Sequence, residues 1–351
     1  MLVALVTAGC GSSSSNPQTV PDAGGDAGIT DAGDAGGPGA CVWCAAGPAR
    51  PDRISVSSIW GTSPTDIWLS GRPTPFERTD AVNMFHWDGA GYHEYRVDNL
   101  SAQRVFGLDA SHVWGVGGGA IAAWVPAESR FKQLSSSTQT TPGLSGDYVD
   151  LWGTGPDNLW AVGDNGLSTA RLIHWDGGAW GASDAPELNT SVALHAIWGS
   201  SADDIWAVGD GVFHKGATAT WTKVDVGAPA NQILEGVCGT SSDDVWVVGD
   251  RSTVRHKQGA TWSAVDIAAP ALTQLHSCRA DGAEVWIVGD LVGGAEGGGA
   301  AVFHWNGARW AKEQTFRLDG TRFDNFPVAT AGRVGAELWV TDQHGVLYKS
   351  R

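Results

Sequence analysis

Residues 197–210 read IWGSSADDIWAVGD, and this stretch is one copy of a unit that recurs along the chain. Close variants occupy residues 59–71 (IWGTSPTDIWLSG), 151–164 (LWGTGPDNLWAVGD) and 237–250 (VCGTSSDDVWVVGD). A tryptophan marks each copy, and successive markers are 40 to 53 residues apart. Repeats of this length are typical of arrays in which each unit buries its apolar face against its neighbours. The marker tryptophans are Trp68, Trp114, Trp160, Trp206, Trp246, Trp286 and Trp339.

Each unit contains four short runs that favour β-strands. In the copy that begins at residue 194, these runs are 194–199, 205–209, 212–214 and 221–224. Residues rich in Gly, Asp, Ser and Thr separate them, which is the pattern of β-hairpins, and no helical periodicity interrupts the repeats. Seven units of four antiparallel strands predict an all-β protein, a seven-bladed β-propeller.

The two ends of the repeat region complement one another. The seventh unit stops after three strands, the last of which is expected at residues 346–349. Trp43 precedes Trp60 by 17 residues, which matches the spacing from an outer strand to the next inner strand elsewhere in the repeats. We therefore expect residues 41–46 to supply the missing outer strand and close the ring, which would remove two exposed sheet edges. The propeller domain is then residues 41–351.

The N-terminal region resembles the end of a bacterial lipoprotein signal. Residues 1–10 are apolar and end at Cys10, the expected site of lipidation, but the basic segment that normally begins such a signal is missing. This indicates a signal truncated at its N-terminus; the alternative is an unrelated apolar tail. Residues 11–40 are rich in Ser, Gly, Ala and Asp and are expected to form a disordered tether. The prediction is a lipid-anchored protein of the cell envelope, at the outer membrane or its periplasmic face.

The repeat itself resembles one found in lipoproteins of myxobacteria and related soil bacteria, and the resemblance covers residues 54–349. It implies a propeller and no particular activity. The segments HWDGGAW (174–180) and HWNGARW (304–310) loosely resemble the Asp-box turns of sialidase-like propellers, and kelch and tectonin propellers are more distant comparisons. No catalytic residue is carried over from any of them.

Charge and hydropathy restrict the partners. The 351 residues include 22 Lys and Arg against 38 Asp and Glu, for a net charge of −16. Such a surface repels phosphate backbones, so nucleic acid is not an expected partner. No apolar run approaches the roughly 20 residues that a membrane-spanning helix needs. We therefore expect contact with the membrane only through the lipid anchor, and a monomer.

Binding is expected on the loops that vary between units. These loops join the second strand to the third, or one unit to the next, and in a propeller both kinds lie on the same face. The loop at residues 313–325 combines aromatic side chains with positive charge, which is scarce in this chain. We interpret it as a binding patch; the alternative is that the loop packs on itself. The candidate ligand-binding residues are Phe316, Arg317, Arg322 and Phe323, with Arg72 and Arg78 from an earlier loop.

Four carboxylates occupy one repeat position at the start of these loops. A ring of carboxylates would suit a hard cation such as Ca²⁺, which takes six to eight oxygen ligands. The alternative is that each Asp accepts hydrogen bonds within its own turn. No other cofactor is expected. The candidate ligands are Asp164, Asp210, Asp250 and Asp290.

The cysteines and histidines were assigned by their place in the repeat. Cys238 and Cys278 stand eight residues before their marker tryptophans, where other units carry an aromatic residue, so we expect a disulfide or two packed thiols. Cys41 and Cys44 would form a local disulfide or remain thiols. Five histidines recur at one third-strand position and cannot converge on one metal or nucleophile, so they are interpreted as structural: His86, His174, His214, His256 and His304.

These observations predict a surface-anchored, non-enzymatic lipoprotein that binds a protein or glycan through the variable-loop face. The sequence offers no nucleophile–base pair and no metal triad, so no catalytic residue is assigned. Two alternatives remain open at this point: a hydrolase or lyase acting on polysaccharide, and an envelope assembly factor without a small ligand.

Overall fold

The computed structural model describes residues 43–45, 54–73, 82–135, 146–164, 169–183, 185, 188, 193–218, 220–291, 299–313, 328–334, 337–342 and 347–350. All of them belong to the unit Trp43–Arg351. Within this part the secondary structure is β, apart from one 3-10 turn, η1 (Pro126–Glu128). It contains no helix that is long and apolar enough to cross a membrane.

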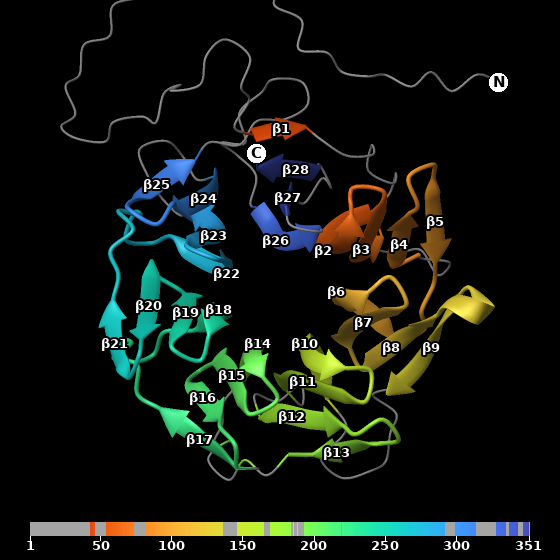
Figure 1. Ribbon diagram of the computed structural model, residues 1–351, viewed down its shortest axis with the longest axis horizontal. Coiled ribbons are helices and arrows are strands. Elements are labelled where there is room, and N and C mark those ends of the chain that lie inside the picture. Colours follow the sequence, from red (N-terminus) through yellow and green to blue (C-terminus); the bar gives the residue numbers. More distant parts are fainter. Residues whose placement is uncertain are drawn as a thin grey trace, which may run out of the picture. The chain divides into compact units, whose positions relative to one another are not determined.

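The repeated element is a four-stranded antiparallel sheet whose strands follow chain order (Figure 1). One sheet consists of β14 (Leu194–Ser201), β15 (Asp204–Gly209), β16 (Val212–Lys215) and β17 (Trp221–Val224). The next consists of β18 (Leu234–Ser241), β19 (Asp244–Gly249), β20 (Thr253–Gln258) and β21 (Thr261–Ala264). A third consists of β22 (Gln274–Asp281), β23 (Glu284–Leu291), β24 (Gly299–Trp305) and β25 (Trp310–Glu313).

The remaining strands form two larger sheets, each made of two sets joined by a pairing of only one or two residue pairs. In one, β2 pairs in parallel with β26 over only two residue pairs; its order is β1 (Trp43–Ala45), β28 (Leu347–Ser350), β27 (Glu337–Asp342), β26 (Val328–Val334), β2 (Ile54–Ser63), β3 (Asp66–Pro73), β4 (Met84–Trp87) and β5 (Tyr92–Tyr95). In the other, the order is β13 (Trp180–Ala182), β12 (Ala170–Trp175), β11 (Asn158–Asp164), β10 (Asp147–Gly155), β7 (His112–Gly118), β8 (Ala120–Val125) and β9 (Arg130–Ser135), and β6 (Leu100–Asp109) also pairs with β7.

The sheets surround a common centre (Figure 1). The innermost strands contact one another in a closed cycle, β2, β6, β10, β14, β18, β22, β26 and back to β2. The expectation of an all-β protein built from four-stranded antiparallel sheets is therefore confirmed. The predicted strand 41–46 has its counterpart in β1, which pairs antiparallel with β28 and sets Trp43 opposite Ser350.

The core lies between adjacent sheets. Trp160 of β11 meets Trp221 of β17 edge-on, with ring centroids 5.7 Å apart, and the same contact joins Trp206 to Trp262 at 5.5 Å. Trp206 and Trp221 are 2% and 1% exposed. Such edge-to-face pairs are favoured by the aromatic quadrupole and add to the burial of large apolar surfaces. The marker tryptophan of one sheet thus packs against the outer strand of the next.

A second contact between sheets requires glycine. The ring of Trp60 lies so close to Gly107 of the neighbouring strand that a Cβ there would be 2.5 Å from ring carbons. A Cβ at Gly199 would be 2.7 Å from the ring of Trp152. Trp198 covers Gly239 in the same way, at 2.7 Å. Packing therefore explains these three glycines: Trp60, Trp152 and Trp198 each lie against a glycine of the following unit.

The register of β22 corrects the alignment of the cysteines. Cys278 lies opposite Ile287, and it is Arg279 that faces the marker Trp286. In β18, by contrast, Cys238 faces Trp246, because a bulge between Gly239 and Ser241 adds a residue that β22 lacks. The expectation that both cysteines occupy the aromatic position was wrong for Cys278 by one residue. They are nevertheless joined by a disulfide between adjacent sheets, with Cα atoms 5.8 Å apart.

We predict that Gly107→Ala lowers the free energy of unfolding by about 1–3 kcal/mol, because its Cβ would force the Trp60 ring out of place. Gly181→Ala is the matched control, since its Cβ would meet no atom within 4 Å and should change stability by less than about 0.5 kcal/mol. Denaturant unfolding measures both. Adding Trp60→Leu should reduce the penalty of Gly107→Ala; equal penalties in both backgrounds would contradict the packing argument.

Candidate functional site

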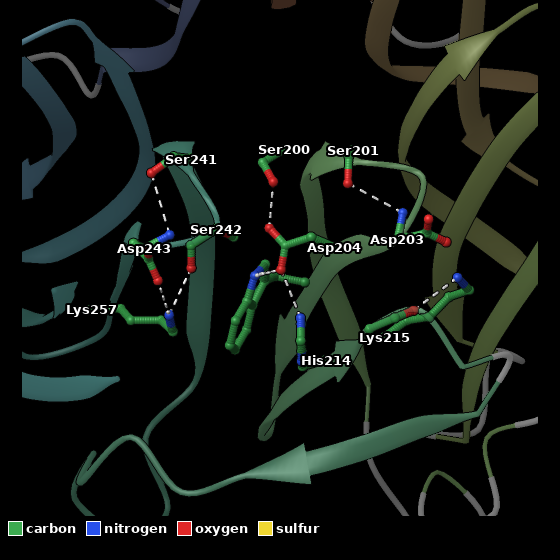
Figure 2. A network of polar contacts seen from close by, with 12 residues as sticks. Ser200, Ser201, Asp203, Asp204, His214, Lys215, Ser241, Ser242, Asp243 and Lys257 are labelled. Carbon is green, nitrogen blue, oxygen red and sulfur yellow. Dashed lines mark hydrogen bonds and ion pairs between the residues drawn. The ribbon is translucent and has the colours of Figure 1, made fainter. Parts of the chain in front are cut away.

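A polar network recurs at the first turn of the sheets. In β15, Asp204 accepts hydrogen bonds from Ser200 Oγ at 2.5 Å, Trp206 Nε1 at 3.1 Å and His214 Nε2 at 2.8 Å (Figure 2). The imidazole of His214 also stacks on Trp206, with ring centroids 4.0 Å apart. The same arrangement joins Thr240, Asp244, Trp246 and His256 in the next sheet, and Thr62, Asp66 and His86 in an earlier one.

This network holds a hydroxyl, a carboxylate and an imidazole but is not arranged for nucleophilic catalysis. An activated serine needs direct contact with the imidazole, with the carboxylate behind it. Here the carboxylate of Asp204 stands between Ser200 and His214, so the imidazole does not contact the hydroxyl. Burial raises the pKa of Asp66, but its hydrogen bonds to His86 and Thr62 outweigh burial and hold that pKa below its usual value. The network stabilises the turn as a carboxylate-centred cap.

Lysines complete the bonding of the same turns. Lys257 Nζ donates to the Ser242 carbonyl at 2.7 Å (Figure 2). Lys215 Nζ donates to the Ala202 carbonyl at 3.0 Å. Lys215 also lies over the ring of Trp160 in the preceding sheet, 5.6 Å from its centroid, a distance suited to a cation–π contact. On the face formed by these turns, these side chains are bonded to one another or to the backbone of the same turns.

A pocket of about 240 Å³ lies at the centre, between the inner strands. Partly exposed aromatic rings border it on one side, and Arg104, Asp150 and Arg279 are its charged residues. Arg279 is paired with Asp281, Nη2 to Oδ2 at 2.7 Å. The aromatic residues are Trp60, Phe106, Trp152 and Trp198.

Arg104 and Asp150 form an ion pair that helps to tie three inner strands together. Arg104 Nε of β6 is 3.0 Å from Asp150 Oδ1 of β10. The other oxygen of Asp150 accepts from the Ile197 amide of β14 at 3.0 Å. Burial raises the pKa of Asp150, while Arg104 and the two amide donors act against that rise. Because both carboxylate oxygens of Asp150 are bonded within the protein, we interpret the ion pair as structural.

Three titratable side chains occupy matching positions on adjacent inner strands. His195 Nδ1 of β14 is 3.6 Å from Glu235 Oε2 of β18, and His276 of β22 bonds Asp290 Oδ2 at 3.0 Å. Burial lowers the pKa of His276, but Asp290, Glu235 and Asp250 outweigh burial and raise it above the usual value. Each of the three is the extra residue of a β-bulge, at the point where its strand shifts register against the second strand of the sheet. The sequence alone does not reveal these bulges.

The candidate calcium ligands are distributed among separate sheets. Asp210 accepts from the Ala193 amide at 2.8 Å, Asp290 bonds His276, and the Asp250 amide donates to Ile233 at 2.9 Å. In the part of the chain that the structure describes, no three His, Cys, Asp or Glu side chains are grouped to hold a metal ion. The four carboxylates are therefore not gathered at a common point.

The variable-loop face carries a larger pocket, of about 430 Å³. It lies between the β15–β16 loop at Asp210 and Gly211, the end of β17, and the connection from β17 to β18. Polar groups line its rim and aliphatic side chains its floor. The rim residues are Asp210, Lys223, Asp225, Asn231 and Gln232. Of the earlier candidates that the structure describes, only Asp210 belongs to this pocket. Sequence reasoning missed the connecting segment because its residues match no binding motif.

Several candidates fall where the structure gives no side-chain placement. Arg72 pairs through its backbone with Ser55 in the β2–β3 hairpin. Cys44 lies in β1, opposite Lys349. Outside the described residues lie Cys10, Cys41, Arg78, Phe316, Arg317, Arg322 and Phe323.

Comparison with known proteins identifies the fold. No protein-family model and no curated protein matches the chain. Among solved structures, YCF48 from Cyanidioschyzon merolae is 14% identical, with a TM-score of 0.63 over 89% of this chain and 99% of that one. The extracellular domain of BT4673 from B. thetaiotaomicron (13% identity, TM-score 0.60) matches 86% of this chain and 38% of that chain. The RRP9 WD40 repeats (9% identity, TM-score 0.60) match 86% and 96%. The protein has a β-propeller fold.

We predict that Arg104→Met lowers the free energy of unfolding by about 3–5 kcal/mol, because the buried Asp150 carboxylate loses its partner. Adding Asp150→Asn should restore part of the loss, since an amide carries no charge and still accepts from Ile197. Arg130→Met is the control: it breaks an exposed pair with Glu128 and should cost less than about 1 kcal/mol. Similar losses in both single variants, measured by denaturant unfolding, would contradict a structural role.

Proposed function

We propose that the protein is a non-enzymatic binding or scaffold propeller, held at the cell envelope by a lipid on Cys10, which recognises a protein or glycan with its variable-loop face. The observation that carries this proposal is the contrast between the two faces. The turn face is occupied by hydrogen bonds among its own side chains, such as the Asp204 network. The loop face holds a pocket of about 430 Å³ built from loops on a rigid scaffold, the usual location of binding residues.

We also infer seven blades, closed by the N-terminal strand. In support, the described strands fall into sets of four, and β1 pairs antiparallel with β28 at the edge of the sheet that contains β26 and β27. A shared last blade would tie the N-terminal segment to the C-terminal strand and protect an exposed edge. This arrangement would place the tether, residues 11–40, directly before the propeller.

The similar structures support a role in binding. One solved structure of YCF48 is described as bound to D1 peptide, and BT4673 is an extracellular domain of a putative one-component system. At 12–14% identity these proteins share only the fold with this chain, so their partners are not transferred. Their relevance is that a propeller of this size can serve as a recognition domain.

We expect the full-length chain to bind a component of the envelope saturably and without turnover. The measurement is a glycan array together with crosslinking to envelope extracts. Alanine substitution of Phe316, Arg317, Arg322 and Phe323 together should weaken binding by at least about tenfold if these side chains are contact residues. Leu108→Ser, at an exposed apolar residue beside the turn of β6, is the control and should bind normally. Hydrolysis of a polysaccharide by the purified protein would overturn the non-enzymatic proposal.

The anchor is tested separately by metabolic labelling with a fatty-acid probe. Label should be incorporated into the chain and lost in Cys10→Ala, because lipidation needs that thiol, whereas Cys44→Ala should retain it. Cell fractionation of the same strains should move Cys10→Ala from the membrane to the soluble fraction. Label that persists in Cys10→Ala would contradict the lipoprotein proposal without affecting the binding proposal.

A further inference from the structure

Two neighbouring connections on the loop face have similar sequences and begin with the same turn. The first, residues 225–233, reads DVGAPANQI, and the second, residues 266–274, reads DIAAPALTQ. Asp225 Oδ1 accepts from the Gly227 amide at 2.8 Å, and Asp266 Oδ1 accepts from the Ala268 amide at 2.8 Å. Both connections therefore begin with the same Asp-centred turn, repeated on adjacent sheets.

The turn between β19 and β20, residues 250–253, holds the two connections together. The Ser252 amide donates to the Thr273 carbonyl at 2.8 Å, and the Ser252 hydroxyl donates to Pro270 at 2.5 Å. On the other side, the Asp250 amide donates to the Ile233 carbonyl at 2.9 Å. Residues 225–233, 250–253 and 266–274 thus form one hydrogen-bonded surface, which we call the linker strip.

Backbone strain is concentrated in the linker strip. Of the six non-glycine residues with positive φ in the described chain, four belong to it, and each such residue costs of order 1–3 kcal/mol. Strain of this kind persists only where the surroundings hold the backbone in one conformation, and it gathers at binding sites. The four are Asn231 (φ 62°), Arg251 (φ 54°), Ser252 (φ 59°) and Ala268 (φ 54°).

The strip exposes apolar side chains from this rigid backbone. Leu272 is 54% exposed and Ile233 36% exposed, and they are two of the three large hydrophobic side chains that the described residues leave exposed. Both are fixed by the 250–253 turn, Ile233 through its own carbonyl and Leu272 through the carbonyls that flank it. The strip contains no Trp, Tyr or Phe on which a sugar ring would stack. Its surface is therefore suited to a protein partner rather than a glycan.

The charge of the strip indicates the charge of that partner. Asp225 and Asp266 are exposed at its two matching turns, and Asp250 lies between them. Arg251 is the only basic residue within the strip, and the neighbouring Arg255 already donates to the Gly227 carbonyl at 2.8 Å. The whole chain carries a net charge of −16, which would attract a basic segment and repel an acidic one.

We propose that the linker strip is a docking surface for a protein segment whose apolar side chains cover Ile233 and Leu272 and whose flanking Lys or Arg residues face Asp225 and Asp266. The proposal rests on the proposed binding function and specifies its partner class. The rigid backbone lowers the entropy that must be lost when the segment binds. The adjoining pocket, which shares residues 228–232 with the strip, gives room for a side chain beyond the apolar contact.

The test is a selection of random phage-displayed peptides on the full-length chain, followed by affinity measurement of the enriched synthetic peptides. We expect enriched peptides to combine aliphatic with basic residues. Leu272→Ser should weaken their binding by about tenfold or more, and Leu108→Ser, the matched exposed leucine beside a β6 turn, should leave it unchanged. Thermal unfolding of each variant confirms that it is folded.

The charge is tested without disturbing the turns. Asp225→Asn with Asp266→Asn keeps an oxygen that accepts from the Gly227 and Ala268 amides but removes both charges. This variant should bind the peptides several-fold more weakly, and its affinity should depend less on salt. No enriched peptide, or enriched peptides that bind Leu272→Ser as tightly as the unchanged chain, would overturn the strip. Binding of an envelope protein that survives Leu272→Ser would also contradict this docking surface, yet leave the general binding function standing.

Discussion

The packing of tryptophans between adjacent sheets is the interaction on which the rest of this structure depends. A marker tryptophan such as Trp206 is 2% exposed and contacts the outer-strand Trp262 of the next sheet. Burial of a large aromatic side chain contributes roughly 4–6 kcal/mol before entropic costs. Since each four-stranded sheet is too small to bury its own faces, these contacts make neighbouring sheets stable only together. Glycine also brings adjacent sheets together, because it lets Trp152 lie directly on the next strand at Gly199.

The same constraint divides the molecule into a uniform face and a variable one. The marker tryptophan must be held in one orientation, and its stacked histidine and the carboxylate of the first turn hold it there, as His214 and Asp204 do for Trp206. The polar groups of the histidine and the carboxylate are therefore already hydrogen-bonded within the protein. The loops on the opposite face do not orient the marker tryptophan, so they can vary in length and composition. The linker strip of that variable face is held in place because the 250–253 turn bonds to both neighbouring connections.

Much of the fold could be predicted from the repeat because its signals are local. The run expected at 221–224 coincides with β17, and those expected at 205–209 and 212–214 differ from β15 and β16 by one residue. The register was less predictable. Counting eight residues back from Trp286 selects Cys278, yet Arg279 faces that tryptophan, since a bulge present in β18 is missing from β22. A bulge depends on pairing with another strand, and spacing along one strand does not reveal it.

The sequence by itself determined the strands, the repeat and the burial of the tryptophans, because hydrophobic alternation and turn residues act over a few neighbouring positions. Only the tertiary structure decided which polar groups are hydrogen-bonded within the protein and which surface is left available for binding. It placed Asp204 between Ser200 and His214, and it gathered residues 225–233, 250–253 and 266–274 into one strip. These relations join residues far apart in the chain or set the order of groups in space, so they exist only once the sheets pack around their common centre.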